Sequence, residues 1–176
     1  MLRVLSGAAA CLLLLAAPTP ATTYRRLTTA DLVRKAERVS CVKCESVEAR
    51  VDPRTGIIFT FVRLRLLEDM KGRSPSSTVR LRIVGGRVGN RATIVAGMPA
   101  FTRGGEAVLL LGHRNRAGYP VLIQARRGVF RLRKDKQGRR YLQGRPTGLG
   151  KADLSGRMSL DAFRGAVRRL ERKAAK

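Results

Sequence analysis

Two stretches of this sequence alternate apolar and polar side chains, and this alternation constrains the fold more than any other feature. They are residues 57–68 and 78–84. Successive side chains of a strand point to opposite faces, so each stretch presents one apolar face to a core and one polar face to water. A third alternating run, 39–51, is joined to the first by Asp52-Pro53-Arg54-Thr55-Gly56, which has the composition of a tight turn. The pattern predicts an antiparallel sheet.

Further strands are expected beyond a Gly-rich segment at 85–105, which we expect to be irregular. The continuous apolar run 107–111 predicts a strand buried on both faces, and the runs 120–125, 128–134 and 139–142 predict shorter strands. A short helix is expected at 30–38 and an amphipathic helix, capped by Ser159, at 160–173. The fold class predicted is mainly β: a small antiparallel OB-like barrel with a short N-terminal helix and an amphipathic C-terminal helix.

Residues 1–21 have the pattern of an export signal. Arg3 gives a basic start, an apolar run follows over 4–17, and Pro18 and Pro20 end that run. The run is short for a membrane-spanning helix, whereas its length suits a removed signal peptide. Cleavage after Ala21 would leave a mature chain with no transmembrane segment, located in the periplasm or outside the cell. An uncleaved anchor and lipidation at Cys11 are the alternatives.

The rest of the chain has the length of one domain. We expect a β-barrel domain at 22–145, a Gly-rich linker at 146–158, and a C-terminal helix at 159–176 that packs on the barrel.

The chain is strongly basic. It carries 37 Lys and Arg against 12 Asp and Glu, a formal net charge of +25. Such a charge attracts polyanions, including nucleic acid, acidic polysaccharide and anionic lipid surfaces. A GC-rich genome also encodes many solvent-exposed arginines, so the composition leaves both explanations open.

An Arg-Leu-Arg triplet occurs three times within the predicted strands. Each triplet places two arginines on one face of its strand and a leucine on the other. If the strands are neighbours, six guanidinium groups line one sheet surface, and like charges there need acidic neighbours, solvent or an anionic ligand. The candidate anion-binding residues are therefore Arg63, Arg65, Arg80, Arg82, Arg131 and Arg133.

Cys41 and Cys44 form a Cys-Val-Lys-Cys motif. In a regular strand these positions face opposite sides, so a disulfide between them requires a bulge or a turn. The spacing leaves open a disulfide, two separately buried thiols and a thiol redox centre. Redox motifs of this spacing lie at a helix N-terminus, whereas the sequence after Cys44 favours a strand.

No catalytic constellation is found. His113 is the only histidine, and no recognised nucleophile motif accompanies it. Cys41, Cys44 and His113 would supply three zinc ligands without a fourth at suitable spacing. We therefore expect no metal, no cofactor and no enzymatic activity.

Several segments together resemble a known layout. They read ADLVRKAERV at 30–39, GIIFTFVRLRLLEDMKG at 56–72, VRLRIVGGRVG at 79–89, VAGMPAFTRGGEAVLLLG at 95–112 and GVFRL at 128–132. Over residues 22–134 the chain resembles a group of exported bacterial proteins and is similar in layout to netrin-like domains, the OB-type barrels of the tissue inhibitors of metalloproteinases. The resemblance implies a barrel and, as an alternative function, a protease-inhibitor-like module. Those inhibitors use an N-terminal cysteine to ligate zinc; a chain starting at Thr22 lacks that cysteine.

The function predicted from the sequence is an exported, non-enzymatic binding module whose arginine-rich sheet face contacts an anionic polymer or an envelope surface. A protein partner is left open. Nucleic acid is disfavoured, because only Phe130 and Tyr141 are available to stack on bases among the basic residues. The alternatives are the netrin-type inhibitor and a thiol redox protein that uses Cys41 and Cys44.

Overall fold

The structure is a computed structural model that describes residues 27–144, 146–149 and 157–174. The expected export signal and most of the expected linker lie outside the described residues. The strands are β1 (Arg38–Val51), β2 (Ile58–Lys71), β3 (Thr78–Val84), β4 (Gly86–Val88), β5 (Arg91–Thr93), β6 (Glu106–Arg114), β7 (Pro120–Leu122), β8 (Val129–Lys134), β9 (Arg140–Leu142) and β10 (Met158–Ser159). The helices are α2 (Thr29–Lys35) and α3 (Leu160–Ala174), with a 3-10 turn η2 (Ala125–Gly128).

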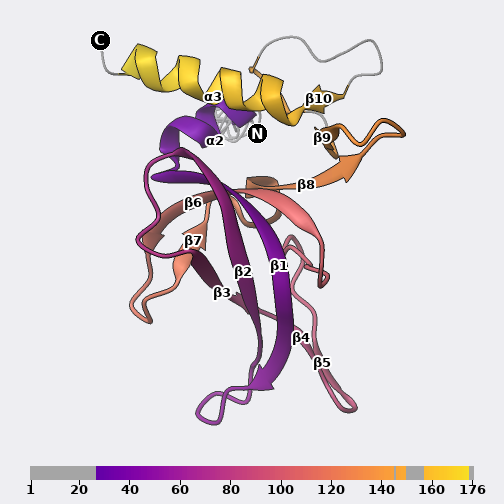
Figure 1. Cartoon of the computed structure of the whole chain (residues 1–176). Helices are drawn as coiled ribbons and strands as arrows, with labels where there is room; N and C mark the ends of the chain where they lie inside the picture. Colours follow the sequence, from indigo (N-terminus) through magenta and orange to yellow (C-terminus); the bar gives the residue numbers. More distant parts are fainter. Residues whose placement is uncertain (1–26, 145, 150–156, 175–176) are drawn as a thin grey trace, which may run out of the picture.

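The fold is mainly β, with one curved antiparallel sheet as its framework (Figure 1). The strand order is β10-β9-β8-β6-β1-β2-β3, β7 pairs with β6, and β4 and β5 form a separate hairpin. Among the described strands, β3 and β10 end the sheet without pairing to each other. The sheet is therefore open, and the closed barrel expected from the sequence is not confirmed.

The sheet separates two hydrophobic clusters. Alternate residues of β1 belong to different clusters: Val39 and Cys41 face the first, Val42 and Cys44 the second. The first cluster is covered by α2 and α3, which contribute residues to it, including the fully buried Phe163. The second lies within the curl of β1, β2, β3 and β6. The alternation of side chains along β1 therefore supplies residues to both clusters.

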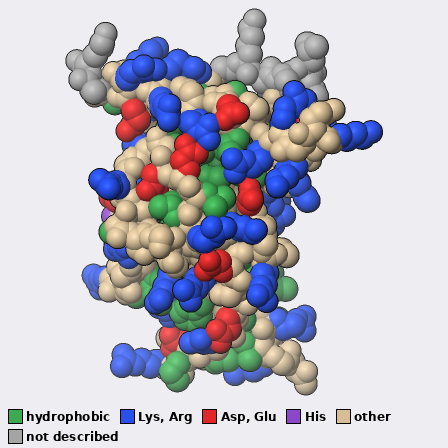
Figure 2. All heavy atoms as spheres, in the orientation of Figure 1, with side chains coloured by type: hydrophobic (Ala, Val, Ile, Leu, Met, Phe, Trp, Pro, Cys, Tyr) green, Lys and Arg blue, Asp and Glu red, His purple; other side chains and the backbone are tan. Residues whose placement is uncertain are grey.

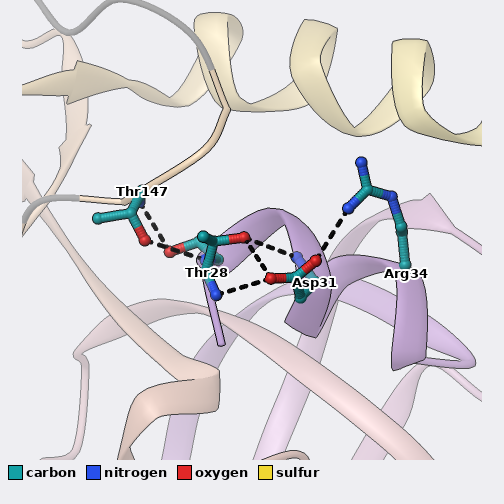
Figure 3. A network of polar contacts seen from close by, with 5 residues as sticks. Thr28, Asp31, Arg34 and Thr147 are labelled. Atoms are coloured by element: carbon teal, nitrogen blue, oxygen red, sulfur yellow. Dashed lines mark hydrogen bonds and ion pairs between the residues drawn. The ribbon is translucent and has the colours of Figure 1, made fainter. Parts of the chain in front are cut away.

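The two helices lie together across one end of the sheet (Figure 1). Helix α2 begins with a capping box in which Thr28 Oγ1 accepts a hydrogen bond from the Asp31 backbone and the Asp31 carboxylate accepts one from the Thr28 backbone. Thr147 extends this network, because its hydroxyl accepts from the Thr29 N–H at 3.1 Å and its own N–H donates to the Thr29 hydroxyl (Figure 3). These bonds hold the segment that contains Thr147 against α2, and thereby seat Leu149 in the first cluster.

Several predicted elements differ from the structure. The helix expected at 30–38 ends at Lys35, and Arg38 already belongs to β1. Met158, expected in the linker, forms β10 with Ser159.

The Gly-rich segment at 85–105 contains the hairpin β4–β5, because Gly85 and Gly86 adopt φ of 104° and 141° and let the chain leave β3 and turn back. Strand β2 continues to Lys71, three residues beyond the alternating pattern, across register shifts in its pairing with β1. The strand expected at 120–125 ends at Leu122, and Ala125 is the first residue of η2.

In the part of the chain that the structure describes, no helix combines the length and the apolar character needed to cross a bilayer.

Candidate anion-binding site

The six arginines predicted to share one surface do not do so. Arg63 and Arg65 lie on β2, Arg80 and Arg82 on β3, and Arg131 and Arg133 on β8. Strands β2 and β3 are neighbours, and Arg63 lies directly opposite Arg80. Strand β8, however, is separated from β2 by β6 and β1. Arg131 pairs with Ala107, which faces the second cluster, whereas Arg63 points away from that cluster. The two groups are on opposite faces of the sheet.

Acidic and aromatic neighbours engage three of the four arginines on β2 and β3. Glu45 lies at the bulge of β1 and pairs with Arg63 Nε at 3.3 Å and Arg65 Nε at 3.9 Å. Arg82 donates to the Asp52 carboxylate at 2.9 Å and stacks on the Phe59 ring, 3.7 Å from the ring centroid. These arginines therefore have local structural roles.

The β8 arginines make weaker contacts. Arg131 donates to the Ala100 carbonyl at 3.0 Å, and Arg133 Nε lies 3.4 Å from the Gln143 side-chain oxygen. Both remain exposed, and neither contact neutralises their charge.

A second group of basic side chains lies where β8 ends and the chain turns into β9. A pocket of about 730 Å³ opens between the β8–β9 hairpin, β10 and the start of α3. We call it the hairpin pocket. Its ionisable lining residues, apart from Tyr141, are five basic side chains and one acidic one: Lys134, Lys136, Arg139, Arg140, Arg157 and Asp135. Blue side chains gather at this corner of the molecule in Figure 2.

The one carboxylate of the pocket is used by the turn. Asp135 accepts hydrogen bonds from the backbone N–H groups of Gln137 at 3.0 Å and Arg139 at 2.8 Å, and Arg139 Nε binds its second oxygen at 2.8 Å. Desolvation raises the pKa of Asp135, but the hydrogen bonds from Arg139 and Gln137 outweigh it and hold that pKa below its ordinary value. Asp135 thus stays ionised and paired, and leaves the exposed lysines Lys134 and Lys136 without a counter-charge from it.

The other walls add positive potential and one aromatic surface. Arg140 lies 3.5 Å from Glu106 and is only partly neutralised at that distance. The Arg157 guanidinium lies 4.9 Å from the centroid of the Tyr141 ring, a cation–π geometry. Ser159 and Ala162, at the start of α3, also line the pocket, so the positive end of the helix dipole faces it. The arrangement is suited to holding an oxyanion.

Part of this site can be recognised in the sequence. Between residues 126 and 145, Asp135 is the only acidic residue among many basic ones. The basic run does not reveal the whole pocket, because Arg157 and the first residues of α3 also line it. These residues follow 134–141 only after a stretch of sequence that has neither strand nor helix periodicity.

Cys41 and Cys44 are free thiols in the structure. Cys41 faces the first hydrophobic cluster and Cys44 the second, so their side chains lie on opposite sides of β1. Burial raises the pKa of Cys41 to about 11 and also raises the pKa of Cys44. A redox centre needs the opposite, a thiol with a lowered pKa.

His113 lies exposed near the end of β6. Among the described residues, no group of three or more His, Cys, Asp and Glu side chains is placed to hold a metal ion.

Comparison of the chain with models of protein families, with curated proteins and with solved structures finds no match, so the geometry described above is the basis for assigning a function.

Proposed function

We propose that this chain is an exported, non-enzymatic binding module that contacts an anionic partner through the hairpin pocket. One observation carries the proposal: five basic side chains and the positive end of α3 surround a pocket whose single carboxylate is already bound by its own turn. The arginines of β2 and β3 support it by contrast, since most of them are paired with carboxylates of the same face.

Export is proposed from the pattern of residues 1–21, and the partner is accordingly an anionic polymer or surface of the cell envelope or its surroundings. A protein partner with an acidic surface would satisfy the same chemistry.

Charge-matched variants test the site. K134Q/K136Q/R139Q removes three cations from the hairpin pocket, and R63Q/R65Q/R80Q removes three from β2 and β3. Binding to dextran sulfate is measured by titration calorimetry over a salt series. We expect the pocket variant to bind roughly tenfold more weakly with a shallower salt dependence, and the strand variant to bind as the wild type does. Equal losses in both would show that the net charge alone is responsible.

We further propose that the sheet is an OB-type barrel opened at one seam. From β1 the sheet continues through β2 to β3 in one direction and through β6 to β7 in the other. Strands β3 and β7 come near each other, because Leu122 of β7 packs against the cluster that contains Val79 and Leu81 of β3. This is the ring order of an OB barrel with the β3–β7 pairing missing. It supports, at the level of layout, the alternative of a netrin-type protease inhibitor, for which inhibition of a panel of extracellular proteases is the measurement.

A further inference from the structure

The outer face of α3 carries a second group of cations. Arg168, Arg169, Arg172 and Lys173 are all exposed, and we call them the helix basic face. Figure 2 shows blue side chains along the top of the molecule, where Figure 1 places α3. None of the four has an ion-pair partner among residues 27–144, 146–149 and 157–174.

The acidic residues of α3 do not neutralise this face. Asp161 pairs with Arg164, which also binds Glu68 through two hydrogen bonds of 2.7 Å. Glu171 pairs with Lys71 at 3.2 Å, on the side of the helix that meets the sheet. Both carboxylates of the helix are thus directed to cations other than the four on the outer face.

The hairpin pocket and the helix basic face both lie along α3, and we call the surface that joins them the track. The pocket lies at the first turn of α3, and the four cations lie in its last two turns. At about 1.5 Å per residue, the rise along α3 is about 9 Å from Ala162 to Arg168 and about 17 Å from Ala162 to Lys173. Ala162 and Gly165, which carry no bulky side chain, lie on the outer side of the intervening turns, together with Asp161, whose carboxylate binds Arg164. Arg169 Nη1 lies 3.5 Å from the position that a Cβ on Gly165 would take, so its guanidinium extends back along the helix toward the pocket.

Two classes of anionic partner fit this track poorly. Binding in a lipid interface requires exposed apolar side chains on the same face, whereas the large exposed hydrophobic residues of the described chain are Val47, Ile57, Ile94, Val95 and Val121, none of them on α3 or the β8–β9 hairpin. Single-stranded nucleic acid binds by stacking on aromatic rings, and the ring of Tyr141 already has a guanidinium against it.

We propose that the hairpin pocket and the helix basic face bind one continuous linear polyanion, an acidic polysaccharide whose sulfate, phosphate or carboxylate groups are contacted at both ends of α3. The inference rests on the proposed function, because it takes the pocket as one end of the track and export as the reason for a polysaccharide. The cations are spaced along a surface that has no large exposed apolar side chains. Such a surface matches a flexible polymer with regularly repeating negative charges, because each contact releases counterions.

The test varies the length of the ligand and the position of the charges removed from the protein. Probes are heparin-derived tetrasaccharide and dodecasaccharide, measured by calorimetry at fixed salt. The helix variant is R168Q/R169Q/R172Q/K173Q. Its matched control, R54Q/R73Q/R87Q/R116Q, removes four exposed arginines from loops and β4. We expect the helix variant to bind the dodecasaccharide roughly tenfold more weakly and to lose less affinity for the tetrasaccharide, because the shorter chain reaches fewer of the four cations from the pocket. The control variant should bind both as the wild type does.

Three results would overturn the inference. The first is a helix variant that binds the dodecasaccharide as its control does, and the second is a tetrasaccharide that binds as tightly as the dodecasaccharide. The third is displacement of the dodecasaccharide by duplex DNA or anionic vesicles that supply fewer negative charges than the dodecasaccharide they displace. Failure of the proposed function is recognised separately, because K134Q/K136Q/R139Q would then bind both oligosaccharides as the wild type does.

Discussion

At the scale of single residues, the neighbours of each arginine decide its role. The Arg82 guanidinium lies between the Phe59 ring and the Asp52 carboxylate, with side-chain exposure of 25%. Arg164 joins α3 to β2 through Glu68, and the hydrogen bonds to Glu68 raise the pKa of Arg164 further above its ordinary value. Lys134 and Lys136 have no such neighbours among the described residues. The same positive charge therefore stabilises the fold at some positions and remains free for a ligand at others.

Gly128 tests the packing of one residue. A Cβ at this position would lie 2.2 Å from the Ile123 carbonyl oxygen, which belongs to the backbone and cannot move aside as a side chain would. We expect Gly128→Ala to lower the free energy of unfolding by about 1–3 kcal/mol, as overpacking does elsewhere. Urea denaturation measures the change. A variant as stable as the wild type would mean that η2 relaxes without cost.

Cys41 predicts a loss of stability at alkaline pH. Its folded-state pKa of about 11 exceeds the ordinary value of 9.0, so below pH 9 both states hold the proton and the thiol contributes nothing to pH dependence. As pH rises through this window, the unfolded state ionises first and is favoured. The difference in unfolding free energy between wild type and Cys41→Ala should fall by about 2 kcal/mol between pH about 8 and about 10.5. Because Cys41→Ala keeps every other group that titrates at alkaline pH, the difference isolates the contribution of Cys41. A difference in unfolding free energy that does not change with pH would contradict a raised pKa for this thiol.

At the scale of elements, the sequence predicts strands well where one face is apolar and the other polar. Residues 78–84 form β3 with the predicted bounds, because Val79, Leu81 and Ile83 alternate with polar side chains. The hairpin β4–β5 was missed, since its short strands lack an apolar face and its glycines indicate a turn. Strand β10 was not predicted for another reason. Met158 was expected in the linker and Ser159 as the cap of the helix, because β10 forms only by pairing with β9, a contact that local sequence does not encode.

Helix α3 offers a stabilising substitution. Gly165 lies in its interior, where glycine weakens a helix by up to about 1 kcal/mol relative to alanine. A Cβ there would meet only the end of the Arg169 side chain, at 3.5 Å, an ordinary van der Waals distance. We expect Gly165→Ala to raise the melting temperature by about 2–4 °C, in contrast to the destabilising Gly128→Ala. A lower melting temperature would show that Arg169 cannot yield.

At the scale of the whole molecule, the site depends on arrangements that no local pattern contains. The Arg-Leu-Arg triplets predict correctly that each arginine pair shares a strand face, but whether three strands are neighbours depends on sheet order. The hairpin pocket likewise forms only when residues 134–141 meet residues 157–162. Both facts arise from long-range pairing, so the candidate site could be predicted in chemistry but not in position.

The charge of the whole chain predicts a salt effect. A net charge of +25 destabilises the compact state through repulsion, and raising the ionic strength from about 0.01 M to about 0.15 M shortens the screening length from about 30 Å to about 8 Å. Exposed ion pairs contribute little by comparison. We expect the melting temperature to rise by several degrees over this range, measured by calorimetry in sodium fluoride, and to rise less for K134Q/K136Q/R139Q. A falling melting temperature would mean that the ion pairs outweigh the repulsion.

The two thiols of β1 report on how this protein unfolds. Cys41 and Cys44 are three residues apart in sequence, yet each is sealed in a different hydrophobic cluster by the same strand. A thiol reagent can reach one sulfur only when the helical layer lifts, and the other only when the curled strands open. Their labelling rates during unfolding therefore measure the cooperativity between the two layers, at sulfur atoms the protein already carries.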